Sequence, residues 1–113
     1  MPGISIHVVD VARGVVATGM RVELYRGAVP VAGGEVGGNG LLEHPALQER
    51  FAAGQYHALF HVADYYRKAG VALPARPFLE VVRYDFGLDQ PEQHYHLPFK
   101  CTPWGYSCFR GGA

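Results

Sequence analysis

Ile4-Ser5-Ile6-His7-Val8-Val9-Asp10 sets the architecture of this chain close to its N-terminus. Every second residue from Ile4 to Val8 is an isoleucine or a valine, and Ser5 and His7 stand between them. Alternation with period two is typical of a strand that buries one face in a core. The pattern therefore predicts a strand over residues 4–10 in which His7 points away from the apolar face.

Further alternating segments follow along the chain. They predict strands at residues 20–25, 55–62, 78–86 and 93–99, with a last short strand at residues 106–109. One short helix is expected over residues 63–69, because Asp64 stands early, Lys68 stands late and Gly70 provides a stop. Seven or eight strands with a single short helix predict an all-β fold of the β-sandwich type.

A turn signal lies within residues 32–42. Asn39-Gly40 stands there between apolar flanks, and an Asn-Gly pair is the strongest short-range signal of a β-hairpin. The two-residue turn of such a hairpin needs a positive φ at both central positions. We therefore expect Asn39 and Gly40 at the tip of a hairpin, with Leu41 just after it.

The bulk composition is that of an ordinary globular protein. With 113 residues, 49% of them apolar, the chain has room for one domain over residues 1–113 with a modest core. Ten basic residues balance ten acidic ones, so no long-range field favours nucleic acid or a membrane, and the expected partner is a small molecule or another protein. No segment resembles a secretion signal or a membrane span, which predicts a cytoplasmic location. Cys101 and Cys108 lack the spacing of a zinc site and are expected to be buried thiols.

Histidines are the candidate chemical groups of this sequence. His94 and His96 share one face of the strand expected at residues 93–99, and His7 comes from a strand distant in sequence. Three interpretations are open: hydrogen-bonded structural histidines, three ligands of a zinc ion, or a proton-transfer pair formed by His7 and His96. The aromatic and glycine-rich run over residues 103–112 can lie beside these histidines, which favours a functional site.

Several segments together carry a family resemblance that covers nearly the full chain. They are Ile4–Asp10, the Gly14 to Leu24 segment, Gly54-Gln55-Tyr56, Phe60-His61-Val62, Asp64-Tyr65-Tyr66, Pro77-Phe78-Leu79, His94-Tyr95-His96-Leu97-Pro98 and the run from Thr102 to Ser107. In this combination the chain resembles the transthyretin-related 5-hydroxyisourate hydrolases. The resemblance implies a transthyretin-like (prealbumin-like) eight-stranded β-sandwich with one short helix.

The resemblance also implies an assembly and a reaction. The assembly is a homotetramer, a dimer of dimers, with active sites in clefts at the dimer–dimer interface. The reaction adds water to a strained cyclic purine derivative and opens its ring, without a metal or an organic cofactor. The two histidines of the family correspond to His7 and His96, and their implied role is proton transfer that activates water.

The chain departs from the family pattern where substrate is expected to bind. The family has Asp-Gly-Arg with a clamping arginine, whereas here Asn39-Gly40 is followed by Leu41. The family ends in Tyr-Arg-Gly-Ser, whereas here Phe109-Arg110-Gly111-Gly112 is followed by one more alanine. Leucine cannot replace the rigid donor fork of arginine, and each lost contact of this kind costs roughly 1.5 to 3 kcal/mol. Arg50 and Arg76 are the alternative sources of a guanidinium.

Two classes of function follow from these residues. The first is a hydrolase of the 5-hydroxyisourate hydrolase type with altered specificity, acting on a cyclic amide or carbonyl substrate, or a specialised-metabolism enzyme for a more apolar one. Its expected substrate-binding residues are Arg110, Leu41, Phe109, Gly112 and His94. The second is a non-catalytic small-molecule binding protein like transthyretin. Transthyretin lacks both histidines of its enzyme relatives, so the presence of His7 and His96 favours the enzyme.

Overall fold

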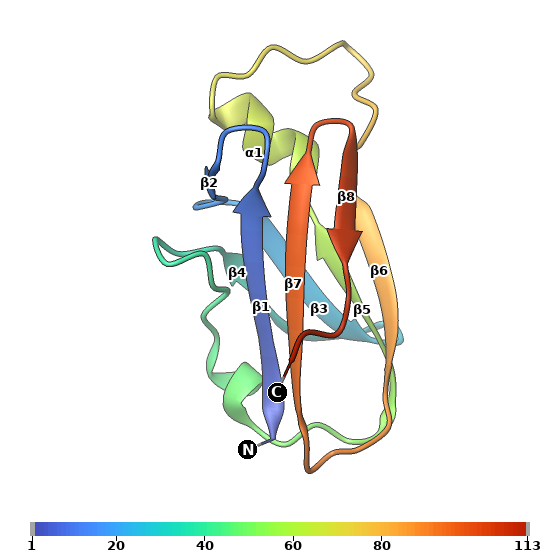
Figure 1. Ribbon diagram of the computed structural model, residues 1–113. Coiled ribbons are helices and arrows are strands. Elements are labelled where there is room, and N and C mark those ends of the chain that lie inside the picture. The colour runs from blue at the N-terminus through green and yellow to red at the C-terminus, as the bar shows by residue number, and fades with distance from the viewer. Residues whose placement is uncertain (1, 113) are drawn as a thin grey trace.

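Two sheets packed face to face make up the computed structural model, which describes residues 2–112 (Figure 1). Within these residues, eight strands form one sheet in the order β2-β1-β7-β8 and a second in the order β4-β3-β5-β6. Their bounds are β1 (Gly3–Asp10), β2 (Val15–Val16), β3 (Arg21–Arg26), β4 (Val29–Glu35), β5 (Gly54–Phe60), β6 (Val82–Leu88), β7 (His94–Thr102) and β8 (Gly105–Cys108). A 3₁₀ turn, η1 (Pro45–Gln48), follows β4, and helix α1 (Val62–Lys68) follows β5. The predicted all-β sandwich with one short helix is confirmed.

The core lies between the two sheets. Ile4, Ile6 and Val8 of β1 are at most 2% exposed, so the predicted apolar face of this strand is confirmed. Phe60 of β5 stacks on Phe99 of β7 with 3.8 Å between the ring centroids, and neither side chain is exposed. Burial of a phenylalanine side chain contributes roughly 1.5 to 3 kcal/mol. This stack therefore joins the two sheets at their centre.

The pairing of β1 with β7 is parallel, whereas the other strand pairs within residues 2–112 are antiparallel. Its register sets Gly3 beside His94 and Ser5 beside His96. Because one face of each strand is buried, these polar side chains lie on the outer face of the β2-β1-β7-β8 sheet. The pairing thus joins residues that stand 91 positions apart in the sequence.

Helix α1 begins at Val62, one residue earlier than predicted, and ends at Lys68. Gly70 stops the helix as expected, with a φ of 82°. Its N–H donates to the carbonyl of Arg67, and the N–H of the next residue donates to the carbonyl of Tyr66, which completes a Schellman termination. No helix within residues 2–112 is long and apolar enough to cross a membrane.

The strand expected at residues 78–86 is shifted in the structure. It begins only at Val82, and residues 71–81 before it have no regular secondary structure. The register pairs Val82 with Phe60, which is the last residue of β5 because the chain turns there into α1. Residues before Val82 therefore have no partner strand, and Phe78 is 69% exposed. β2 and β4 were not predicted as strands, since β2 has two residues and β4 contains Gly33 and Gly34.

The turn at Asn39-Gly40 has the predicted place but not the predicted type. Gly40 has a φ of 83°, whereas Asn39 does not have a positive φ. The N–H of Gly40 donates to the carbonyl of Gly37 at 3.0 Å, so the turn is centred one residue earlier than expected. The side-chain oxygen of Asn39 accepts a hydrogen bond from the N–H of Leu41 at 3.0 Å, which stabilises this arrangement locally.

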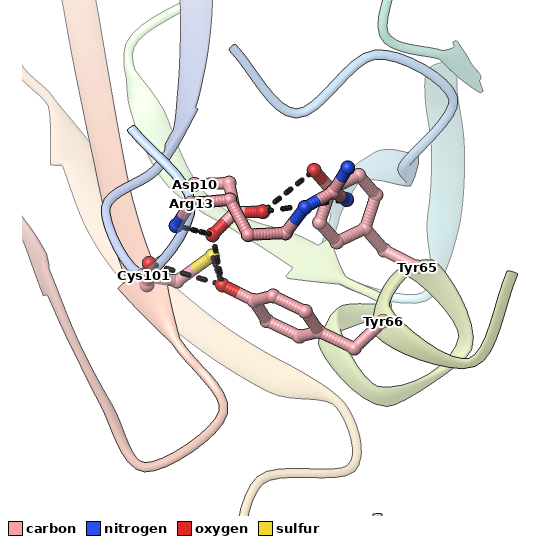
Figure 2. Close-up of polar contacts among 5 residues, drawn as sticks. All are labelled: Asp10, Arg13, Tyr65, Tyr66 and Cys101. Carbon is pink, nitrogen blue, oxygen red and sulfur yellow. Dashed lines mark hydrogen bonds and ion pairs between the residues drawn. The ribbon is translucent and has the colours of Figure 1, made fainter. Parts of the chain in front are cut away.

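A buried carboxylate ties α1 to the end of β1 (Figure 2). Asp10 is fully buried and accepts hydrogen bonds from the hydroxyls of Tyr65, at 2.8 Å, and Tyr66, at 2.6 Å. The guanidinium of Arg13 lies 3.8 Å from the same carboxylate, and the carbonyl of Cys101 also accepts from Tyr66. Burial and Asp10 raise the pKa of Tyr65 to about 12 and raise the pKa of Tyr66 as well. Both hydroxyls therefore remain donors at neutral pH.

The two thiols differ in their burial. Cys101 is 1% exposed, as expected, whereas Cys108 is only half-buried, so the expectation of two buried thiols holds for the first of them. Burial raises the pKa of each thiol to about 11. Both groups are thus neutral thiols at physiological pH.

Asp10→Ala is expected to lower the free energy of unfolding by about 3 kcal/mol or more, because it leaves two buried tyrosine hydroxyls without their acceptor. Urea denaturation followed by circular dichroism measures the change. Asp85→Ala is the matched control, since that carboxylate pairs with Arg83 on the surface, and it should change stability by less than about 1 kcal/mol. Equal effects of the two substitutions would contradict an anchoring role of Asp10.

Candidate active site

Three side chains on the outer face of the β1–β7 pair form a hydrogen-bonded group. The hydroxyl oxygen of Ser5 lies 2.8 Å from Nε2 of His94 and 2.6 Å from Nδ1 of His96. Ser5 is on β1 and both histidines are on β7, so the parallel register creates the group. Ser5 was not singled out in the sequence, although its spacing of two from His7 already placed it on the same face as that histidine.

His7 lies on the same outer face beside the Gly37–Leu41 turn. Its Nε2 is 3.2 Å from the carbonyl oxygen of Asn39, and its backbone forms an isolated antiparallel bridge with Leu41. The turn approaches the ring so closely that a Cβ on Gly40 would lie 2.6 Å from Nε2. Glycine at this position therefore permits both the positive φ and the contact with His7.

The two neighbouring imidazoles act electrostatically on His96. Burial lowers the pKa of His96 below its usual value, and the charges of His7 and His94 lower it further. His96 is therefore a neutral ring near pH 7, with one nitrogen able to accept a proton. The structure thus brings together the two histidines that the sequence suggested as a proton-transfer pair, and adds His94 to them.

The C-terminal tail returns across this sheet toward β1 (Figure 1). The guanidinium of Arg110 lies over the ring of Tyr95, with 3.9 Å between its central carbon and the ring centroid. It also donates hydrogen bonds to the side chain of Gln93, at 2.9 Å, and to the carbonyl of His94, at 3.3 Å. These contacts hold the tail against β7.

The next residues of the tail cover His96. The N–H of Gly111 donates to the carbonyl of His96 at 2.7 Å, and a Cβ on Gly111 would lie 2.8 Å from the imidazole. Phe109 is 47% exposed, and Lys100 lies over its ring at 5.9 Å from the centroid. Gly112 is exposed at the end of the described chain, whereas the additional Ala113 lies outside the described residues.

A hollow of about 470 Å³ opens beside the Ser5 group. It is lined by Pro2, Ile4, Ser5, Asn39, Leu41, Leu42, Glu43, His44, Leu47, Gln48 and His94. Its volume is in the range of small-molecule sites. Of the substrate-binding residues expected from the sequence, Leu41 and His94 belong to this lining, whereas Arg110, Phe109 and Gly112 do not, within the described chain.

Within residues 2–112, no arginine lines this hollow. Arg50 forms an ion pair with Glu92, and Arg76 lies exposed in the irregular segment between α1 and β6. Neither of them belongs to the lining residues of the hollow within the described chain. Its wall is therefore less cationic than the family pattern implies.

A zinc site was one of the three interpretations of the histidines, and the positions of their side chains test it. Among residues 2–112, no group of three or more His, Cys, Asp or Glu side chains is placed to hold a metal ion. One ring nitrogen of His94 and one of His96 instead share the hydroxyl of Ser5. These hydrogen bonds fit a structural or a proton-transfer role.

The structure is a β-sandwich of two four-stranded sheets, in which β7 with His94 and His96 runs parallel to β1 with His7. This arrangement defines a protein of the transthyretin-like class. The chain belongs to the HIUase/Transthyretin family, whose family model matches residues 4–111. This confirms the resemblance read from the sequence.

Named relatives cover almost the whole chain. It is 40% identical to a 5-hydroxyisourate hydrolase of Deinococcus radiodurans, over 97% of this chain and 96% of the relative. It is 37% identical to the 5-hydroxyisourate hydrolase 2 of Rhizobium meliloti, over 96% and 94% of the two chains. These names confirm the expectation of an enzyme of this hydrolase type.

Solved structures agree with the fold. The 5-hydroxyisourate hydrolase of Klebsiella pneumoniae matches with a TM-score of 0.83 and 26% identity, over 99% of this chain and all of the other. An (S)-allantoin synthase matches with a TM-score of 0.89 and 33% identity, over 97% of this chain. This chain spans only 43% of the length of that second protein.

Proposed function

We propose that this protein is a hydrolase that opens the ring of a cyclic amide or related carbonyl compound, with His7 and His96 as a metal-free acid–base pair. The observation that carries the proposal is a neutral, partly buried His96 on the same sheet face as His7, hydrogen-bonded to Ser5. Ser5 in turn lines a hollow of small-molecule size, although His7 and His96 themselves are not among its lining residues within the described chain. Imidazoles suit proton transfer near neutral pH, and a well-placed acid or base contributes a factor of about 10² to 10⁴ in rate.

The proposed reaction consumes one water molecule. One imidazole accepts a proton from the water while the oxygen adds to the carbonyl carbon of the ring. The ring C–N bond then breaks, and the other imidazole, in its protonated form, gives a proton to the leaving nitrogen. The protons balance over the two histidines, so this scheme needs no further reactant.

The substrate of the named relatives, 5-hydroxyisourate, is the first compound to consider. Leu41 stands where the family has its clamping arginine and lines the hollow, so we propose a specificity that differs from theirs and favours a less polar ring. Phe109 and Gly112 stand where the family has a tyrosine and a serine. Both replacements remove a hydroxyl group and so also favour a less polar substrate. Arg110 serves to hold the tail, as its contacts with Gln93, Tyr95 and His94 support.

We also propose that the active form is a homotetramer, located in the cytoplasm. β8 is an edge strand of its sheet, and Trp104, Tyr106 and Phe109 on and beside it are 47% to 61% exposed. Exposed aromatic side chains gathered along an open strand edge mark a surface for association. The family resemblance implies that the active sites of such a tetramer lie in clefts between subunits, so a further subunit would complete the site.

His96→Ala and His7→Ala are each expected to lower kcat by a factor of about 10² to 10⁴. The assay follows the decay of freshly generated 5-hydroxyisourate, and of more apolar cyclic amides, with and without protein. His61→Gln is the control, because His61 pairs with Glu23 on the other sheet. Undiminished turnover by His96→Ala would refute the acid–base role, and tight binding of an aromatic ligand without any turnover would indicate a carrier instead.

Leu41→Arg is expected to raise kcat/KM for 5-hydroxyisourate by roughly 10- to 150-fold, since one charged contact contributes about 1.5 to 3 kcal/mol. Leu41→Met is the control that keeps an apolar side chain of similar size. Steady-state kinetics of the three proteins measure the effect. An unchanged kcat/KM in Leu41→Arg would mean that position 41 does not set the specificity.

Sedimentation velocity is expected to show a tetramer over the micromolar concentration range. The association follows from the exposed aromatic edge at β8. Trp104→Glu should shift the distribution toward smaller species, because burial of a carboxylate opposes association. A wild-type protein that sediments as a monomer would contradict the proposal of a composite site.

A further inference from the structure

We infer that Ser5 and His94 are positioning residues that fix the tautomer of His96, so that its Nε2 is the nitrogen that accepts the proton of water. This inference rests on the proposed function for its catalytic part. It assigns the base of the acid–base pair, which the sequence left open.

A backbone carbonyl determines which atoms donate and which accept in this chain of hydrogen bonds. Nδ1 of His94 lies 3.4 Å from the carbonyl oxygen of Pro2, which can only accept. Nδ1 of His94 therefore carries the hydrogen. In a neutral imidazole the other nitrogen is then an acceptor, so Nε2 of His94 accepts from the hydroxyl of Ser5 at 2.8 Å.

A serine hydroxyl has one hydrogen to give. Once Ser5 donates to His94, its oxygen must accept from Nδ1 of His96 at 2.6 Å. Nδ1 of His96 consequently carries the hydrogen, and Nε2 of the neutral ring keeps a free lone pair. This is the arrangement of a general base whose other nitrogen is held by a neighbour.

The charges around His96 keep it in the form that this chain of hydrogen bonds requires. It faces His7 from β1 and His94 from its own strand, and Arg110 of the tail lies on the carbonyl of His94. Each of these groups disfavours a second proton on His96 when it is itself charged. These charges and burial keep His96 neutral, and the hydroxyl of Ser5 determines which nitrogen of the neutral ring carries the hydrogen.

Histidine NMR tests the tautomer without any substrate. In protein labelled with ¹⁵N-histidine, two-bond ¹H–¹⁵N correlation spectra should show a protonated Nδ1 and an unprotonated Nε2 for His96. His94→Leu should reverse this tautomer, because the freed hydroxyl of Ser5 then donates to Nδ1 of His96. His94→Gln should keep the wild-type tautomer, since its amide oxygen can accept from Ser5. A protonated Nε2 of His96 in the wild type would overturn the inference.

Kinetics test the consequence for turnover. Ser5→Ala should lower kcat at least about tenfold with little change in KM, and Ser5→Thr should restore it. The acidic limb of kcat/KM should move to lower pH in Ser5→Ala, because a hydrogen bond that favours the charged ring is lost. Ser107→Ala on β8 is the control.

The outcomes separate the two proposals. If the predicted tautomer is found and no compound is turned over by the wild type, the proposed function fails and the hydrogen-bond assignment stands. If the wild type is active and Ser5→Ala has the same kcat and pH profile, the positioning role is refuted while the hydrolase remains.

Discussion

The parallel pairing of β1 with β7 is the constraint on which the rest of this structure depends. Its register sets Ser5 opposite His96 and at the same time buries Ile4, Ile6 and Leu97 in the core. A slip by one residue would turn the histidines of β7 inward and expose the apolar face. Core packing and the geometry of the polar group are therefore maintained by the same hydrogen-bonded ladder.

The alternating pattern of single strands was readable from the sequence because it is local. It correctly placed the buried face of β1 and the common face of His94 and His96. The start of β6 was not readable, since it depends on where β5 ends and α1 begins. The turn at Asn39 differed in type because the side chain of Asn39 bonds to the next residue but one, a choice that the Asn-Gly pair alone does not reveal.

The candidate site likewise depends partly on residues that the sequence identifies and partly on contacts between segments that are distant in the sequence. His7 and His96 emerged from the resemblance, whereas Ser5 acquires its meaning only from the register with β7. The carbonyl of Pro2, which directs the hydrogen bonds of this group, leaves no trace in the sequence, because every residue has a carbonyl. Arg110 was expected among the substrate-binding residues, and its contacts with β7 favour a role in holding the tail.

The backbone, not the side chain at position 41, holds the turn against β1. The carbonyl of Gly40 accepts from the N–H of Val8 at 2.8 Å, and the N–H of Leu42 donates to the carbonyl of Ile6 at 3.0 Å. His7 is likewise bonded to the carbonyl of Asn39. A leucine in place of an arginine therefore changes the wall of the hollow without moving His7. Because the proposed acid–base pair and the binding surface are supported by different atoms, the substrate preference of this fold can change while its proton-transfer groups stay in place.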